Sequence, residues 1–210
     1  MTFSTVFIDL DDTVYPKTSG LWQAIRQRLE IYMRERVHIP PDEIPALREQ
    51  LFSTYGTTMR GLQALYAIDT QDYLAYVHDV PISNFIQPDL ITRAALLKLP
   101  QRKAIFTNAD SNHARRVLDV LQLSDCFDQI VDINAISPFC KPMAEAFQIA
   151  LRCAGEQDAT RCVLVDDQPR NLAVARQLGF FTVCLGCNMP SDQYHTAIQQ
   201  LSELGQVINL

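Results

Sequence analysis

The sequence predicts an α/β fold, a doubly wound Rossmann-like parallel sheet with a small helical cap inserted near its beginning. From residue 88 onward, short apolar runs alternate with segments of helical pattern, which is typical of a parallel sheet covered by helices on both faces. The apolar runs are continuous, as expected of strands that are buried on both faces. A long helical stretch separates the first apolar run from the others, and this interruption predicts the insertion.

The first strand is expected near residues 4–9, and a series of helices follows it. Apolar residues at spacings of three and four mark one face of the first helix, namely Leu21, Ile25, Leu29, Tyr32 and Met33. The two prolines at 40–41 end this helix, and Asp42 is expected to cap a second one that runs to about Tyr55. Two more helices are expected over 57–67 and 70–78.

The rest of the chain supplies the alternating elements of the sheet. Helices are expected over 89–98, 111–121, 142–153 and 169–178, and strands over 103–106, 129–133, 162–165 and 180–185. Residues 191–210 are expected to add a helix and a short tail. These assignments predict a core domain of residues 1–16 and 87–210 and a helical cap domain of residues 17–86.

Composition limits the possible partners. The 210 residues are 48% hydrophobic and 20% charged, which suits one globular domain with a modest insert. A net charge of −6 argues against general binding to nucleic acid polymers. No apolar run approaches the ~20 residues of a membrane helix, and the N-terminus lacks the basic region of a signal peptide. We therefore expect a cytoplasmic protein that binds neither nucleic acid polymers nor a membrane. The oligomeric state is not indicated.

The six cysteines all lie in the second half of the chain and are scattered, as in a reduced cytosolic protein. Cys184 and Cys187 form a CxxC motif, which is found in redox pairs and in half of a zinc site. Because no second CxxC and no histidine pair at ligand spacing accompanies it, we expect two small thiols at a strand end.

Polar residues gather where the predicted strands end. They are Asp9 with Asp11, Thr107 with Asn108, Lys141 in a following loop, and Asp166 with Asp167. Singly, each fits a turn, a helix cap or a surface charge. In a doubly wound sheet, however, ligands bind beyond the carboxyl ends of the strands. The joint placement of these residues at one edge therefore predicts a functional site.

Their chemistry suits phosphoryl transfer on a small phosphate ester. Asp9 and Asp11 are two residues apart, so a strand directs them to one side. One carboxylate attacks phosphorus to form an aspartyl-phosphate, and the other protonates the leaving oxygen and later activates water. Mg²⁺, with Asp167 as a further ligand, cancels the repulsion between carboxylate and phosphate. Lys141 adds positive charge, and Thr107 donates a hydrogen bond to a phosphate oxygen.

The chain resembles the haloacid-dehalogenase-like hydrolase superfamily in four motifs that occur in the family's order. They lie at residues 7–13 (FIDLDDT), 105–108 (IFTN), 140–142 (CKP) and 165–171 (VDDQPRN). The resemblance implies Asp9 as nucleophile and metal ligand and Asp167 as a second carboxylate ligand. It implies Asp11 as the acid and base, with a backbone carbonyl that binds the metal. Mg²⁺ is the implied cofactor.

The same resemblance gives supporting residues. Asp166, which replaces a common glycine, is expected near Lys141 and the metal, with Asn171 beside it. Asp12 also replaces a common glycine and is expected to be a solvated turn residue. The presence of Asp11 favours a phosphatase, because the metal-free dehalogenases of the superfamily lack the second aspartate.

A narrower resemblance links residues 55–62, 106–114 and 165–171 to the pyrimidine 5′-nucleotidase group. It implies hydrolysis of pyrimidine nucleoside monophosphates such as UMP or CMP. The alternatives are a phosphatase for another small ester, such as a sugar phosphate or phosphoglycolate, and a non-catalytic nucleotide-binding relative. Asn108, Arg60 and Tyr15 are the candidate substrate contacts, although an arginine on a helix is usually solvated and a tyrosine usually packs in a core. His113 is expected at the surface.

Overall fold

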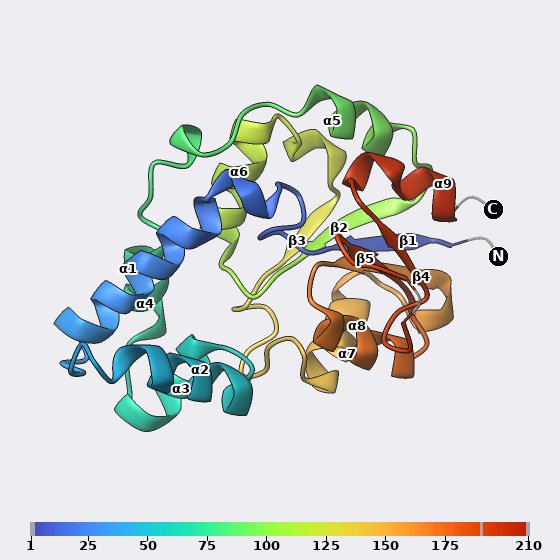
Figure 1. Ribbon diagram of the computed structural model, residues 1–210. Coiled ribbons are helices and arrows are strands. Elements are labelled where there is room, and N and C mark those ends of the chain that lie inside the picture. Colours follow the sequence, from blue (N-terminus) through green and yellow to red (C-terminus); the bar gives the residue numbers. More distant parts are fainter. Residues whose placement is uncertain (1–2, 190, 209–210) are drawn as a thin grey trace. The chain divides into compact units, whose positions relative to one another are not determined.

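The computed structural model describes residues 3–189 and 191–208. The chain divides into two compact units, Met1–Lys17 with Ile86–Leu210, and Thr18–Phe85. The first unit contains the sheet, and the second is built of helices (Figure 1). The role of the helical unit as a cap stays a prediction.

The larger unit contains a six-stranded parallel sheet in the order β3-β2-β1-β4-β5-β6. The strands are β1 Thr5–Ile8, β2 Arg102–Phe106, β3 Gln129–Val131, β4 Cys162–Asp166, β5 Phe181–Leu185 and β6 Thr196–Ile198. The chain adds strands first on one side of β1 and then on the other, so the strand order reverses between β1 and β4. The predicted doubly wound sheet is confirmed, and its switch point is the place where such sheets bind ligands.

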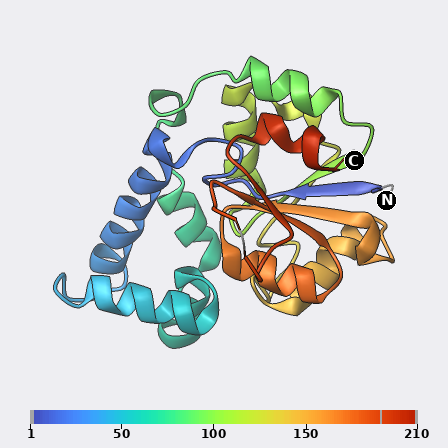
Figure 2. The same cartoon turned by 45° about the vertical axis from the view of Figure 1, so that its right-hand side comes forward.

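Helices cover both faces of this sheet. In Figures 1 and 2, α5, α6 and α9 lie on one face and α7 and α8 on the other. Their bounds are α5 Leu90–Leu97, α6 Ser111–Leu121, α7 Ala144–Cys153, α8 Pro169–Gln177 and α9 Leu204–Ile208. A complete cover on both faces explains why every residue of β1 and β4 is buried.

An aromatic cluster packs against the central strands. Phe7 lies edge-on to Phe106 and Phe180, with ring centroids 6.2 and 5.9 Å apart. Phe147 of α7 meets Phe106 at 5.4 Å in the same geometry. Such pairs contribute about 0.5–1.5 kcal/mol each beyond the burial of their surface. The cluster therefore holds the ends of β1 and β2 in place, next to the residues that follow each strand.

The C-terminal segment differs from the prediction. A helix and a short tail are expected in 191–210, and the structure has an α-helix there at Leu204–Ile208, but it also has an unexpected strand, β6 Thr196–Ile198, beside β5. A strand of three residues is too short to show a periodic pattern. The strand expected over 129–133 ends at Val131, and the helix expected from 142 begins at Ala144.

The CxxC motif also differs from the prediction. A disulfide joins Cys184 at the end of β5 to Cys187, where two thiols were expected. Gly186 between them has φ +71°, a left-handed conformation that glycine adopts without steric cost. This turn brings the two Cα atoms to 5.6 Å, within the normal range for a disulfide. Spacing alone does not reveal a turn of this kind.

The unit Thr18–Phe85 contains α1 Leu21–Glu35, α2 Ile44–Tyr55, α3 Thr58–Tyr66 and α4 Thr70–Val77. All five residues of the predicted α1 face are buried. The prediction that Asp42 caps α2 is wrong, because Glu43 occupies that position and no side chain caps the helix. A Cβ on Gly61 would lie 2.6 Å from Leu51, so the close packing of α3 against α2 requires glycine there.

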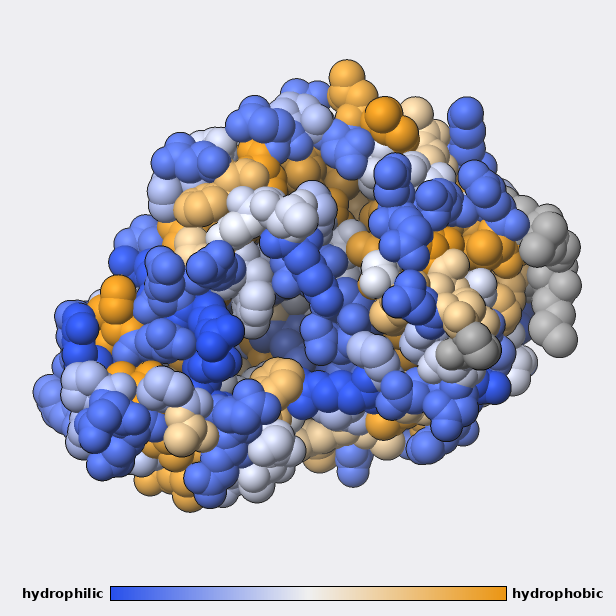
Figure 3. All heavy atoms as spheres, in the orientation of Figure 1, coloured by the Kyte–Doolittle hydropathy of each residue, from blue (hydrophilic) through white to orange (hydrophobic). Residues whose placement is uncertain are grey.

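Hydrophilic residues cover most of the face drawn in Figure 3. Exposed large hydrophobic side chains include Leu90, Ile91 and Leu97 of α5. Within residues 3–189 and 191–208, we find no helix with the length and apolar character needed to cross a membrane. The cytoplasmic location and the absence of a nucleic acid partner stay predictions.

Candidate active site

The amine of Lys141 is the centre of a buried charge cluster. Its Nζ atom donates to Asp9 Oδ1 at 2.6 Å, to Asp166 Oδ2 at 2.8 Å and to the Phe106 carbonyl at 2.8 Å. These acceptors match the three N–H groups of an ammonium ion. Burial alone lowers the pKa of Lys141, but the nearby carboxylates of Asp166 and Asp9 outweigh it and hold this pKa above its ordinary value. The amine is therefore a fixed positive charge.

The register of the sheet brings the two carboxylates to this amine. β1 lies between β2 and β4, with Ile8 opposite both Ile105 and Val165. Asp9 continues the ladder, since its N–H donates to the Val165 carbonyl at 2.9 Å. Asp9 thus lies beside Asp166 at the switch point. Thr13, in the turn that follows, donates to Asp9 Oδ2 at 3.3 Å.

Three carboxylates offer a possible metal site. One oxygen each of Asp9, Asp166 and Asp167 lies within 4.8 Å of the others. Burial is the main reason why the pKa of Asp9 is raised, and Asp166 and Asp167 raise it further against the opposing effect of Lys141. Burial and Asp166 likewise raise the pKa of Asp167. Lys141 and Lys17 supply two positive charges against three carboxylates, so the donor set still fits a divalent cation that prefers oxygen ligands, such as Mg²⁺.

Asp12 adds to the same negative charge. Burial, followed by Asp167 and Asp11, raises the pKa of Asp12 to about 7, although Lys17 opposes the shift. Its Oδ1 atom is buried without a hydrogen-bond partner. The prediction of a turn is confirmed, but the expected full solvation is not found. A φ of 59° places this residue in the left-handed region, which aspartate tolerates better than most residues.

Asp166 is held by the start of α8. Asn171 Nδ2 lies 3.0 Å from both Asp166 oxygens, and the Gln168 N–H donates to Oδ1 at 2.8 Å. Lys141 donates to Oδ2 as well, so Asp166 links the amine to the carboxylate cluster, and Asn171 holds Asp166 through a separate side-chain contact. Their supporting role there stays a prediction.

Two other side chains hold Asp167, and the sequence did not indicate one of them, Lys17. Lys17 Nζ lies 2.9 Å from Asp167 Oδ2, and Gln168 Nε2 donates to the same oxygen at 2.7 Å. The Lys17 side chain is 58% exposed, whereas that of Asp167 is 3% exposed. No motif marks Lys17, because an exposed lysine has no distinctive sequence pattern.

Thr107 and Asn108 follow β2 and have different contacts. Thr107 Oγ1 accepts the Ala109 N–H at 3.0 Å, so its hydroxyl proton is left to act as a donor. Asn108 forms two hydrogen bonds with the backbone of Lys141, donating to its carbonyl at 3.0 Å and accepting its N–H at 2.9 Å. Asn108 thereby fixes the loop that carries Lys141, and its predicted contact with substrate stays a prediction.

The Asp11 carboxylate contacts two residues whose roles the sequence did not reveal. Tyr15 donates its hydroxyl to Asp11 Oδ1 at 2.6 Å, and His113 Nε2 lies 3.1 Å from the same oxygen. His113 is 1% exposed, so the prediction of a surface position is wrong. Its place on the apolar face of α6, with Val117 at four-residue spacing, was the signal available in the sequence. Stacking of Tyr15 on a substrate stays a prediction.

Arg60, the remaining predicted substrate contact, belongs to the helical unit. It is 8% exposed, and its Nη1 atom donates to Gln63 Oε1 at 3.0 Å. The predicted alternative of a solvated surface arginine therefore does not hold. A contact between Arg60 and substrate stays a prediction.

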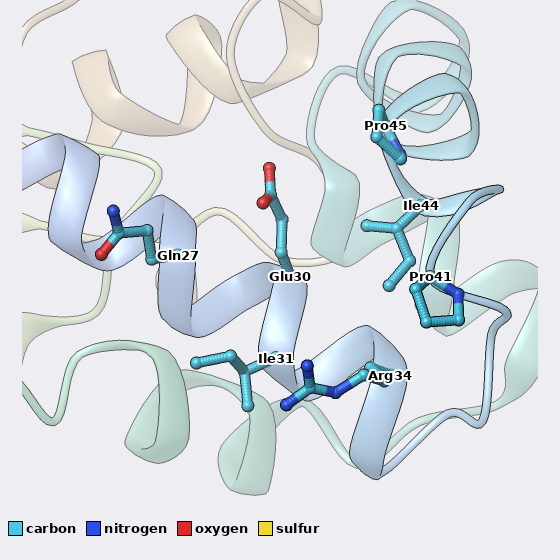
Figure 4. Close-up of a pocket in the computed structure, with 7 residues that line it drawn as sticks. All are labelled: Gln27, Glu30, Ile31, Arg34, Pro41, Ile44 and Pro45. Atoms are coloured by element: carbon cyan, nitrogen blue, oxygen red, sulfur yellow. The ribbon is translucent and has the colours of Figure 1, made fainter.

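Figure 4 shows a hollow in the helical unit, between α1 and the start of α2. Its lining consists of Gln27, Glu30, Ile31, Arg34, Pro41, Ile44 and Pro45. Glu30 lies 3.3 Å from Arg26 and 3.5 Å from Arg48, so ion pairs of the unit itself balance its charge. These seven side chains include no nucleophile and no pair of carboxylates, which distinguishes the hollow from the site at the sheet.

The sequence of residues 3–179 matches the family model of the haloacid dehalogenase-like hydrolases. This match covers most of the sheet unit and the whole inserted helical unit. The chain belongs to the haloacid dehalogenase-like hydrolase family. The resemblance seen in the four sequence motifs is thereby confirmed at the level of the family.

A curated relative of this hydrolase is Phosphate metabolism protein 8 of Saccharomyces cerevisiae, which is 27% identical over 187 residues. The alignment covers 82% of this chain and 58% of the yeast protein, so the chain spans less than two thirds of that relative.

Solved structures show the same fold. The putative HAD-hydrolase YfnB of Bacillus subtilis, bound to magnesium, has a TM-score of 0.64 at 17% identity and full coverage of both chains. A HAD phosphatase of Thermococcus onnurineus has a TM-score of 0.67 at 16% identity, with 98% of each chain covered. A 2-haloacid dehalogenase of Pseudomonas syringae pv. Tomato has a TM-score of 0.64 at 21% identity, with 99% of each covered. These neighbours include a phosphatase and a dehalogenase, so the fold alone does not select the reaction.

Proposed function

We propose that this hydrolase is a Mg²⁺-dependent phosphatase that cleaves small phosphate monoesters through an aspartyl-phosphate. The observation that carries the proposal is the position of Asp9. Its carboxylate lies at the switch point of the sheet, 2.6 Å from the Lys141 amine and within the carboxylate cluster formed with Asp166 and Asp167. A fixed cation, a nucleophilic carboxylate and a place for a divalent cation are what transfer of a dianionic phosphoryl group requires.

Each residue has a distinct task in this mechanism. Asp9 attacks phosphorus, while Asp11 protonates the leaving oxygen and then takes a proton from the attacking water. Lys141 and the Thr107 hydroxyl stabilise the charge on the phosphoryl oxygens. The side chains of Asp9 and Asp167 and the backbone carbonyl of Asp11 would hold Mg²⁺. When bound, the ion neutralises the phosphate and orients it toward the nucleophile.

For the substrate we propose a nucleoside 5′-monophosphate, in particular a pyrimidine nucleotide. The support is the resemblance of residues 55–62 and 106–114 to the pyrimidine 5′-nucleotidase group. A sugar phosphate or phosphoglycolate is the alternative, because the roles proposed for the residues around Asp9 concern the phosphoryl group and not the rest of the ester. The non-catalytic alternative is less favoured, since it leaves the buried cluster of Asp9, Lys141 and Asp167 without a use.

A panel of phosphate esters tests this proposal. Phosphate release from UMP and CMP is expected to exceed release from sugar phosphates and phosphoglycolate, and chelation of Mg²⁺ is expected to stop all of it. A preference for sugar phosphates would replace the proposed substrate but keep the reaction. Halide release from 2-haloacids that persists in a chelator would instead indicate a dehalogenase and contradict the phosphatase proposal.

Metal binding has a test that is independent of activity. Mg²⁺ at about 100 times its dissociation constant is expected to stabilise the fold by about 2.7 kcal/mol, seen as a rise in Tm. The substitution Asp167→Asn is expected to remove most of this rise, because it removes one of the clustered carboxylates. Asp42→Asn, at an exposed position of the helical unit, is the control and keeps the full shift. An equal shift in Asp167→Asn and the control would contradict the proposed metal site.

A further inference from the structure

We infer that Tyr15 and His113 are positioning residues that hold Asp11 Oδ1 and thereby assign proton transfer to Asp11 Oδ2. This inference rests on the proposed phosphatase function and deepens it. It specifies which atom of the acid and base exchanges the proton and which side chains make that choice.

Both contacts are made to the same oxygen. The Tyr15 hydroxyl lies 2.6 Å and the His113 Nε2 atom 3.1 Å from Asp11 Oδ1. Because an ionised carboxylate is an acceptor only, the Nε2 atom of His113 carries the hydrogen in this contact. The Tyr15 hydroxyl is the donor in the other contact. Two donors thus converge on one atom.

This convergence determines where Asp11 is protonated. A carboxylic acid proton on Oδ1 would point at two groups that already direct hydrogens to that atom, so it is disfavoured there. The proton therefore resides on Oδ2 when Asp11 acts as an acid. Two hydrogen bonds also fix the rotation of the carboxyl group, which keeps Oδ2 in one orientation. Fixed orientation of a reacting group is a recognised source of rate enhancement.

Two separate segments supply the donors. Tyr15 follows the turn after β1, in which the N–H groups of Thr13 and Val14 donate to the Leu10 carbonyl at 3.2 and 3.0 Å. His113 lies in the first turn of α6, where Asp110 caps the helix by accepting the His113 N–H at 3.0 Å. The loop after β1 and the helix after β2 are each fixed by their own hydrogen bonds. The contacts of Tyr15 and His113 with Asp11 are therefore set by the fold of these two segments.

The proton follows a balanced path through Oδ2. In the first step an oxygen of Asp9 bonds to phosphorus, the bond to the leaving oxygen breaks, and that oxygen keeps the electron pair and takes the proton from Asp11 Oδ2. In the second step Oδ2 takes a proton from water as the water oxygen bonds to phosphorus. The bond from phosphorus to Asp9 then breaks, which returns the electron pair to the Asp9 carboxylate.

The dependence of the rate on the leaving group distinguishes this role from simple packing. An alkoxide leaving group needs the proton, whereas a phenolate from an acidic phenol leaves well without it. Tyr15→Phe and His113→Leu are therefore expected to lower kcat/KM, which covers only the steps through the first phosphoryl transfer, by about 10-fold to 100-fold for alkyl phosphates such as nucleotides, below the full range of general acid help. Their kcat/KM for nitrophenyl phosphate is expected to change little. His113→Gln, which places an amide N–H near the Nε2 position, is expected to recover part of the loss.

The experiment measures kcat and KM for a series of phosphate esters from nitrophenyl to alkyl, in wild type and in these three variants. Tyr73→Phe, which removes another buried tyrosine hydroxyl from the helical unit, is the matched control and shows no selective loss. A uniform loss of kcat/KM across the series in Tyr15→Phe and His113→Leu, or no loss of kcat/KM, overturns the inference and leaves the proposed function in place. If wild type releases no phosphate from any ester, the proposed function fails, and this inference fails with it.

Discussion

Phosphate release is expected to fall by about 10⁵-fold or more when Asp9 is replaced by asparagine, the scale seen when a catalytic nucleophile is removed. An amide oxygen is a poor nucleophile, so the covalent intermediate does not form. Asp9 also meets Lys141 Nζ at 2.6 Å and belongs to the carboxylate cluster. The same substitution therefore weakens the proposed metal site. Acid quenching during turnover of an ester with a labelled phosphate group measures the loss directly. Wild-type protein is expected to retain the label as aspartyl-phosphate, and Asp9→Asn is expected to retain none.

Asp12→Asn is the matched control for this experiment. It makes the same chemical change three residues away, at a carboxylate that has no assigned part in the reaction. Removal of its charge relieves repulsion with Asp167 and Asp11, the two charged groups that raise its pKa. The variant is therefore expected to fold and to retain most of its turnover. If Asp9→Asn turned over as fast as Asp12→Asn, Asp9 would not be the nucleophile.

The sequence revealed the part of this fold that depends on strand order. Continuous apolar runs predicted the buried strands, and parallel strands bring their carboxyl ends to one edge. Asp9 and Asp166 each come at the end of a central strand, so they are expected to lie close together. The hydrogen bond from the Asp9 N–H to the Val165 carbonyl joins the two strand ends. The short strand β6 was missed because three residues at the edge of a sheet carry too little pattern.

The contacts between side chains could not be predicted in the same way. His113 is 102 residues from Asp11, and only the folded chain shows that their side chains meet. Lys17 near Asp167 and Asn108 on the backbone of Lys141 are likewise long-range contacts that leave no local pattern. Residue type and spacing indicate which groups reach an edge of the sheet. The partner that each group selects depends on rotamers and packing.

Replacement of Lys141 by methionine is expected to lower the free energy of unfolding by about 3–5 kcal/mol, the usual cost of leaving buried charges without their partner. Methionine fills a similar volume but supplies none of the three N–H groups. Asp9 and Asp166 would then be buried beside Asp167 with no cation between them. Chemical denaturation of the metal-free protein measures the loss. Phosphate release is expected to disappear as well, because the fixed charge near the phosphoryl group is gone.

Two comparisons identify the cause of this loss. Lys17→Met breaks the 2.9 Å contact with Asp167, but the Lys17 side chain is 58% exposed and solvent screens the pair, so a cost below about 1 kcal/mol is expected.

The dependence of the stability loss on pH gives the second comparison. The pKa of Asp9 is already raised in the folded protein, and loss of Lys141 removes the group that lowers it. A carboxyl with a raised pKa binds more protons folded than unfolded, so its contribution to stability falls as pH rises above the ordinary value of 3.8 and recovers as pH is lowered. The deficit of Lys141→Met is therefore expected to narrow at acidic pH. A deficit equal to that of Lys17→Met, or one that does not change with pH, would show that the amine does not neutralise these carboxylates.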